Sequence, residues 1–275
     1  MDKRLLTIQD ISCVGQCSLT VALPIISACG IETAILPSAV LSTHTGGFKN
    51  YTFKDLTDEM PKIEAGWNKD GLKFDAFYTG YVCEPQIDPI LSIMNSTAAP
   101  GAVRIVDPAM ADNGKLYPGF GPDFPSHMKR LCKGADYILP NLTEAALLVG
   151  EEPRLSGYDV AYIEDLLRKL AGIGAKNVLL TGVSYEADKL GVALYDGSKV
   201  RYYFRPRLNR LSHGTGDVYA SVFAGALMRG ADPLKAASLA AEVVCKAIEA
   251  TPDEHWYGVC FEKTLGYLAG QLEGL

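Results

Sequence analysis

The sequence predicts an α/β fold: a single domain built as a three-layer sandwich, with a mostly parallel central sheet and helices on both faces. Short apolar runs alternate with runs of helical periodicity along most of the 275 residues, which is typical of a parallel sheet. The strand-like runs are almost continuously apolar, as strands buried on both faces should be. No linker, low-complexity segment or internal repeat divides the sequence, so we expect one domain over 1–275.

The first half of the chain supplies four strands and four helices. Short apolar runs predict strands at 4–10, 31–41, 74–82 and 102–110. Apolar residues at helical spacing predict helices at 19–30, 53–67, 87–97 and 124–134. Pro61 lies inside the second helix. We expect it to disturb that helix, because proline lacks a backbone N–H.

The second half changes character near its end. Strands are predicted at 135–141 and 177–183, and helices at 142–150 and 158–174. The next two runs, 189–197 and 199–208, are separated by a turn that contains glycine, which predicts a hairpin. Only helices follow, at 216–229, 232–250 and 260–271.

Composition excludes several classes of protein. The net charge of −6 and a pI near 5.3 argue against a general nucleic-acid binder, although local backbone amides can still hold a small anion. No apolar window is long enough for a signal peptide or a membrane span. The seven cysteines form no C-x-x-C pair, which is typical of reduced thiols in a cytoplasmic protein. A metal site at Cys13 and Cys17 is disfavoured, because no second Cys/His pair lies nearby in the sequence.

Polar side chains gather where the predicted strands end. In open parallel sheets, ligands bind outside the carboxyl ends of the strands. We therefore expect these residues to line one active site: Asp10, Ser12, His44, Thr45, Tyr81, Asp107, Asn141 and Thr181.

Residues 214–217, Gly-Thr-Gly-Asp, open a long apolar helix. A helix start carries unpaired N–H groups and a partial positive charge, and glycines let an anion approach closely. Gly214, Thr215 and Gly216 are therefore predicted to form an anion hole. Asp217 beside that anion suits a base that takes a proton from an attacking hydroxyl. The pattern indicates phosphoryl transfer to a hydroxyl group.

The same four residues have a simpler interpretation. Thr or Asp at a helix start can merely cap it, and glycine is tolerated there. Two other nucleotide-binding folds are disfavoured. The sequence contains no G-x-x-x-x-G-K-[ST] loop, and the stretch lacks the third glycine of a dinucleotide-binding motif.

Several motifs in order carry a family resemblance. GTGDVYASVFAGAL resembles the signature of the ribokinase superfamily, whose members phosphorylate hydroxymethyl groups with ATP. IVDPAM followed by Asp112, PNLTEA and LLTGV match further segments of that superfamily in the same order. The resemblance implies the ribokinase-like version of the predicted sandwich.

Within the superfamily the sequence is most similar to the pyridoxal kinase family. IQD resembles the family's opening segment, STHTGGF its His-Thr segment and YTGYV its Thr-Gly-Tyr, while LYP places Tyr117 on the lid side. The resemblance implies phosphorylation of pyridoxal, pyridoxine or pyridoxamine. It also implies the use of ATP and Mg²⁺ and a homodimer, and it leaves open the use of a monovalent cation such as K⁺.

The resemblance implies a role for each site residue. Asp217 is the base, and Gly214, Thr215 and Gly216 bind the γ-phosphate. The expected nucleotide ligands are Asp107, Asn141, Glu144, Thr181 and Gly182. The expected metal ligands are Asp107, Asp112 and Glu144. The expected lining of the pyridine pocket is His44, Thr45, Tyr81, Tyr117 and one or both of Asp10 and Ser12.

Three departures from the family pattern stand out. Asp10 replaces a frequent Ser, which leaves open whether Asp10 or Ser12 contacts the ring. Gly182 also replaces a frequent Ser, which removes one phosphate contact. His213 stands before Gly214, where a related subgroup has a lid cysteine.

Three alternative functions remain. Hydroxymethylpyrimidine kinase acts on a similar flat nitrogen ring that bears a CH₂OH group, and the His44–Thr45 and Tyr81 pattern favours the pyridoxal substrate over it. A sugar kinase would need more hydrogen-bonding side chains than IQDISC offers. A non-catalytic binder of pyridoxal phosphate gains nothing from a carboxylate at Asp217.

Overall fold

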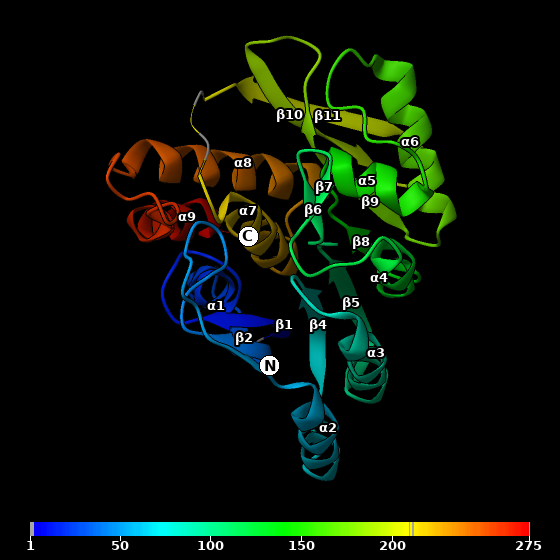
Figure 1. The fold of residues 1–275 in the computed structure, drawn as a ribbon, viewed down its shortest axis with the longest axis vertical. Helices are drawn as coiled ribbons and strands as arrows, with labels where there is room; N and C mark the ends of the chain where they lie inside the picture. The colour runs from blue at the N-terminus through cyan, green and yellow to red at the C-terminus, as the bar shows by residue number, and fades with distance from the viewer. Residues whose placement is uncertain (1–2, 209, 211, 275) are drawn as a thin grey trace.

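The computed structural model describes residues 3–208, 210 and 212–274. Its centre is a nine-stranded sheet in the order β11-β10-β9-β8-β5-β4-β1-β2-β3 (Figure 1). The strands are β1 (Arg4–Ser12), β2 (Glu32–Leu41), β3 (Phe53–Asp55), β4 (Phe74–Thr79), β5 (Ala98–Val106), β8 (Tyr137–Ile138), β9 (Asn177–Val183), β10 (Lys189–Tyr195) and β11 (Val200–Pro206). The six strands from β2 to β9 in that order pair in parallel, and β3, β10 and β11 add antiparallel edges. The predicted mostly parallel sheet is confirmed.

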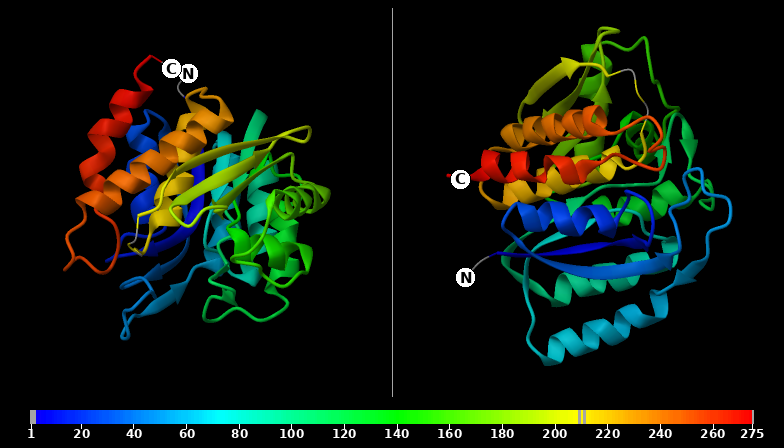
Figure 2. Two further views of the ribbon diagram at one scale, coloured as in Figure 1. Left: turned by 90° about the horizontal axis from the view of Figure 1, so that it is seen from above. Right: turned by 90° about the vertical axis from the view of Figure 1, so that its left-hand side faces the viewer.

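Helices cover both faces of this sheet, as Figure 2 shows. One layer holds α2 (Met60–Lys69), α3 (Ile87–Ser96), α4 (Phe124–Cys132), α5 (Leu142–Val149) and α6 (Val160–Gly172). The other layer holds α1 (Leu19–Ala28), α7 (Thr215–Met228), α8 (Pro233–Ala250) and α9 (Leu265–Leu272). Short 3₁₀ turns lie at Thr57–Glu59, Glu84–Gln86 and Phe261–Thr264. The structure is therefore one α/β domain with three layers, as predicted.

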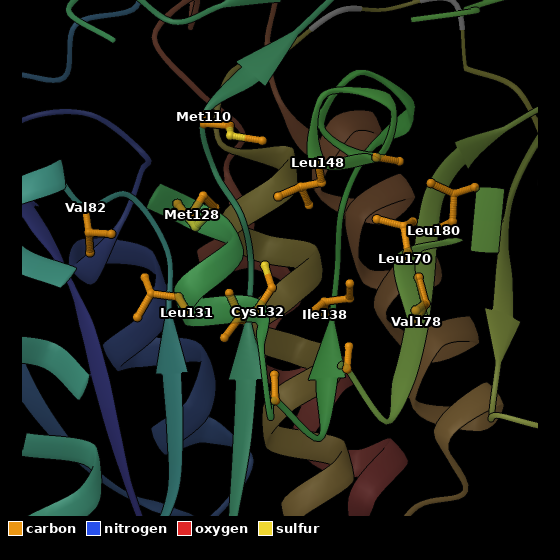
Figure 3. Close-up of a cluster of buried hydrophobic side chains, with 14 of the residues drawn as sticks. Val82, Met110, Met128, Leu131, Cys132, Ile138, Leu148, Leu170, Val178 and Leu180 are labelled. Atoms are coloured by element: carbon orange, nitrogen blue, oxygen red, sulfur yellow. The ribbon is translucent and has the colours of Figure 1, made fainter. Parts of the chain in front are cut away.

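The core divides into two clusters, one on each side of the sheet. Along β1, Leu6 enters the first cluster while its neighbour Leu5 enters the second. Along β4, Phe77 and Ala76 divide in the same way. Successive strand side chains point to opposite faces, so a strand between two helix layers must be apolar at every position. Figure 3 shows part of the first cluster, where side chains of α4 lie near those of β8 and β9.

The region predicted as a helix at 53–67 is wrong in its first half. Phe53–Asp55 forms the edge strand β3, a 3₁₀ turn follows, and α2 begins only at Met60. Pro61 does not disturb α2, because it lies in the first turn. The N–H that proline lacks has no partner inside the helix at that position.

Two further predicted strands have different bounds in the structure. The strand predicted at 135–141 is ladder-paired only at Tyr137–Ile138, with one further bridge between Asn141 and Thr181. The strand predicted at 102–110 is β5, which ends at Val106. Beyond it, β6 (Ala111–Asp112) and β7 (Lys115–Leu116) form a small separate ribbon that was not predicted.

The seven cysteines are free thiols, as expected. Among the described residues, no helix has the length and apolar character needed to cross a bilayer.

Candidate active site

The start of α7 is held open by glycine. Gly214 has φ of 78°, in the left-handed region, where a side chain is unfavourable. A Cβ atom there would lie 1.7 Å from the backbone oxygen of Gln16. Gly216 has open space where a Cβ would stand. The glycines thus serve different purposes: Gly214 permits a close approach of two backbones, and Gly216 leaves room in front of the helix.

No side chain of the described residues caps α7. The nearest candidate, the Thr215 hydroxyl, instead faces the carbonyl of Ser212 at 3.5 Å. Within 3–208, 210 and 212–274, the N–H groups of the first turn therefore have no side-chain acceptor, and such groups favour an anion. The capping interpretation of residues 214–217 does not describe this helix, whereas an anion hole fits it.

Asp217 lies half-buried in this first turn. Burial raises the pKa of its carboxyl to about 7, and the nearby Asp10 adds to the rise, while the backbone of Ser18 opposes it. A pKa near the working pH is the value that suits a general base.

Asp10 ends up buried beside two serines at the end of β1. It is 5% exposed. Its carboxyl accepts hydrogen bonds from the Ser18 hydroxyl at 2.6 Å and the Ser12 hydroxyl at 3.0 Å. Burial raises the pKa of Asp10 in spite of these bonds. Ser12 is 1% exposed and points its hydroxyl at Asp10, so of the two predicted ring contacts it acts first as support for Asp10.

The Asn-x-x-Glu motif turns out to be a double cap on α5. The Asn141 side chain accepts from the N–H of Glu144 at 2.9 Å, and Glu144 accepts in return from the N–H of Asn141 at 2.9 Å. This is a capping box. The other Glu144 oxygen accepts from the N–H of Met110 at 3.1 Å. The motif therefore fastens the loop after β5 to the start of α5.

This arrangement argues against Glu144 as a direct metal ligand. Glu144 is 2% exposed, and both its carboxyl oxygens face backbone N–H groups. Burial raises its pKa to about 8, against the lowering effect of those N–H groups. The contact with Met110 has no local signal in the sequence, because Met110 is 34 residues away along the chain.

Asp107 follows β5 and faces two other acids. Burial raises the pKa of its carboxyl well above the usual value, and Glu144 and Asp217 raise it further. Asp112 is exposed at the end of β6, where its carboxyl accepts from the N–H of Asn113 at 2.8 Å. It is near enough to Glu144 to raise the pKa of that carboxyl. Among the described residues, no three His, Cys, Asp or Glu side chains form a ready-made metal site.

His44 is not free to bind a ligand through its ring nitrogens. Nδ1 accepts from the N–H of Gly46 at 3.0 Å, so Nε2 carries the proton and donates to the carbonyl of Tyr257 at 2.7 Å. Burial lowers its pKa and favours this neutral form. Thr45, the next residue, is exposed. In this geometry His44 joins two loops, and the expected ring contacts of both residues stay predictions.

Tyr81 follows β4 and carries an aromatic stack that the sequence analysis missed. Its ring stacks on Phe120 with centroids 5.2 Å apart, and Phe120 stacks on Phe124 at 3.9 Å. Burial raises the pKa of Tyr117, and the nearby acids Glu144 and Asp107 raise it further. Tyr81 thus remains a candidate wall of a ring pocket, and the ring contact of Tyr117 stays a prediction.

Thr181 and Gly182 end β9 beside the start of α5. The N–H of Thr181 donates to the carbonyl of Pro140 at 2.9 Å, and Thr181 bridges Asn141. Gly182 has φ of 78°, with open space where a Cβ would lie. The register between β9 and β10 shifts at this point, so Gly182 has no paired partner on β10.

The chain resembles known proteins over most of its length. The model of the family described as phosphomethylpyrimidine kinase matches residues 25–258. The chain belongs to this family. A structure described as a putative phosphomethylpyrimidine kinase from Bacteroides thetaiotaomicron is 36% identical, with a TM-score of 0.92 over 97% of this chain and 94% of that one. A second crystal form of it contains pyridoxal.

Two further relatives differ in their described function: one is a pyridoxal kinase and the other a thiamine biosynthetic enzyme. The pyridoxal kinase of Lactobacillus plantarum is 33% identical, with a TM-score of 0.90 over 98% of both chains. The bifunctional thiamine biosynthetic enzyme TH1 of Arabidopsis thaliana is 27% identical over 84% of this chain. The match spans only 44% of that plant enzyme. The chain is thus a member of a kinase family with the ribokinase-like fold, and the likeness to pyridoxal kinases is confirmed.

Proposed function

We propose that the protein transfers the γ-phosphoryl group of ATP to the 5′-hydroxymethyl group of pyridoxal, pyridoxine or pyridoxamine. One observation carries the proposal: Asp217, with a pKa raised to about 7 by burial, lies in the first turn of a helix whose N–H groups have no side-chain cap. This pairing of a base with a place for an anion suits attack of a hydroxyl on a phosphoryl group.

The base and the anion hole divide the work of the reaction. Asp217 takes the hydroxyl proton as the oxygen attacks phosphorus, the new O–P bond forms, and the bond to the leaving ADP breaks. The N–H groups of Gly214, Thr215 and Gly216 stabilise the negative charge on the transferred group. Because Gly216 leaves open space, the γ-phosphoryl group can approach the helix closely.

The nucleotide side of the site is rich in acids. Asp107 lies near Glu144 and Asp217, and a bound divalent cation would favour the ionised forms of this cluster of carboxyl groups. Mg²⁺ usually binds through one or two carboxylates together with phosphate oxygens, so Asp107 alone, supported by waters, suffices as a protein ligand. When bound, the ion would neutralise phosphate charge. Thr181, Gly182 and Asn141 lie at the edge where the phosphates of ATP would rest.

The ring side of the site offers a polar and an aromatic partner. Asp10, steadied by Ser12, can accept a hydrogen bond from the ring's polar edge. Tyr81, backed by Phe120, presents a stacking face. A flat aromatic ring suits these partners better than a sugar does.

Relatives support a vitamin B6 substrate. The structure of the 36% identical Bacteroides protein has been solved with pyridoxal. The 33% identical Lactobacillus protein is a pyridoxal kinase, and the match covers nearly its whole length. The second candidate is hydroxymethylpyrimidine kinase, which the description of the matching family and the plant thiamine enzyme favour. The monovalent cation, the homodimer and the cytoplasmic location stay predictions.

A coupled ATPase assay with Mg²⁺ decides between these functions. Pyridoxal, pyridoxamine, pyridoxine and hydroxymethylpyrimidine are assayed separately, and we expect turnover on the B6 vitamers with little on the pyrimidine. The opposite preference would keep the base and the anion hole and assign the pyrimidine substrate. If none of the four compounds supports ATP consumption, the enzyme proposal is contradicted and a binder of pyridoxal phosphate is favoured.

A further inference from the structure

The chain leaves β9 through an irregular step at Gly182. Its neighbours Thr181 and Val183 pair with consecutive residues of β10, at 191–192. Gly182 is the extra residue between them and has φ of 78°. An extra residue of this kind is a β-bulge, which bends the strand and changes where its neighbours point. The direction of the end of β9 therefore depends on what holds the chain beyond the bulge.

A tyrosine hydroxyl holds the chain directly after the bulge. The N–H of Ser184 donates to the hydroxyl of Tyr158 at 2.9 Å. β9 ends at Val183 and β10 begins only at Lys189, so this N–H lies outside the ladder of the sheet. A partly buried N–H that the ladder does not use needs another acceptor, and Tyr158 supplies it.

Tyr158 is itself fixed from outside the loop that it holds. It is buried in the first cluster of the core, and its ring packs on that of Tyr162 in α6, with centroids 5.9 Å apart. The next residue, Asp159, caps α6, because its carboxyl accepts from the N–H of Tyr162 at 2.9 Å. The core and α6 therefore set the position of the hydroxyl, and the hydroxyl sets the position of Ser184.

We propose that Tyr158 is a positioning residue for ATP, whose hydroxyl holds the chain after β9 so that Thr181 and Gly182 are directed towards the phosphates. This inference rests on the proposed function, in which those two residues meet the nucleotide. A segment that is already held in its bound conformation costs less entropy to order when the ligand binds. The hydroxyl should therefore act on the binding of ATP, while the chemical step, which belongs to the start of α7, keeps its rate.

The other end of β10 supplies a matched control. The hydroxyl of Tyr195 donates to the carbonyl of Gly197 at 3.0 Å, in the turn between β10 and β11. Tyr195 also packs against the first cluster of the core. Tyr158→Phe and Tyr195→Phe therefore each remove one hydroxyl that is bonded to a backbone group, and both keep the aromatic ring in place.

The test measures steady-state kinetics of both variants in the full-length enzyme with pyridoxal and Mg²⁺. We expect KM for ATP to rise about three- to tenfold in Tyr158→Phe, the scale of one hydrogen bond, with kcat and KM for pyridoxal within about twofold of wild type. Calorimetric titration with ATP should show the same factor in Kd. Tyr195→Phe should keep all of these values. Amide hydrogen exchange in 182–188 should be faster in Tyr158→Phe than in wild type.

An unchanged KM and Kd for ATP in Tyr158→Phe would overturn the proposal, and so would an equal rise in Tyr195→Phe. Failure of the proposed function is recognised separately. A wild-type enzyme without turnover on any vitamer would refute that function, whereas the Kd for ATP in the two variants would still decide the role of Tyr158.

Discussion

The backbone oxygen of Gln16 occupies the place where a Cβ atom on Gly214 would stand, because the two positions are only 1.7 Å apart. The loop between β1 and α1 therefore lies against the candidate anion hole. Position 214 requires glycine both because a Cβ would clash with this loop and because its φ is 78°.

A methyl group at this contact should disable the anion hole. In Gly214→Ala the added carbon forces the loop and the start of α7 apart, so we expect kcat to fall by about 10²-fold or more and the melting temperature to drop. The matched control is Gly216→Ala, whose Cβ meets open space and which should keep the wild-type melting temperature. Equal melting temperatures for Gly214→Ala and wild type would contradict the close contact.

The role of Asp217 predicts a loss of turnover with binding retained. Asp217→Asn removes the proton acceptor but keeps the size of the side chain, so kcat should fall by about 10²–10⁴-fold. Calorimetric titration should show that ATP still binds. In the wild type, kcat/KM should fall as the pH drops through about 7, because the base must be deprotonated. Near-normal turnover in the variant would remove Asp217 from the mechanism.

The raised pKa of Asp217 also predicts an effect on stability. Its pKa is about 7 in the fold against an ordinary value of 3.8, so the folded state binds more protons than the unfolded state between these values. Stability contributed by the neutral carboxyl is therefore lost as the pH rises through 7. Asp217→Asn should melt at a higher temperature than wild type at pH 8, and the difference should shrink at pH 5. A variant that melts below wild type at pH 8 would contradict the burial cost.

His44 is predicted to act mainly through stability. His44→Ala leaves the Tyr257 carbonyl and the Gly46 N–H without partners, which should lower the free energy of unfolding by about 1–3 kcal/mol in urea titration. His127→Ala is the control, because its two ion-pair contacts are long, at 3.7 Å, and lie at the surface. It should change stability by about 0.5 kcal/mol at most. A stable His44→Ala with a raised KM for the vitamer would return His44 to the substrate pocket.

Asp107 and Glu144 should separate into a metal role and a structural role. Asp107→Asn should raise the Mg²⁺ concentration needed for half-maximal activity, because it removes the carboxylate that is available to a cation. Glu144→Gln should chiefly lower the melting temperature, because an amide cannot accept the N–H bonds on both of its ends. If Glu144→Gln instead raised the Mg²⁺ requirement at an unchanged melting temperature, direct metal binding by Glu144 would be favoured.

The order of layers and the site's location were predictable from the sequence for a local reason. Leu5 and Leu6 are adjacent and both apolar, which already indicates a strand covered on both faces. Gly214 and Asp217 at the head of an apolar run already indicate an anion site beside a base. These features depend on residues that are close in the chain, and the periodicity of strands and helices determines on which face those residues lie.

Partners from distant segments decided the rest. His44 and Tyr257 lie 213 residues apart, so no local pattern could show that the ring nitrogens of His44 are already taken. Glu144 likewise meets Met110 only in the fold.

The sequence by itself determined the sandwich, and it predicted the edge of the sheet that carries the candidate site and the candidate base, Asp217. Only the tertiary structure decided which polar side chains remain free for a ligand and which, such as those of Ser12 and Ser18, are used to hold Asp10 in place. The physical reason is that burial obliges each polar group to find a partner, and that partner is chosen by packing rather than by position in the chain.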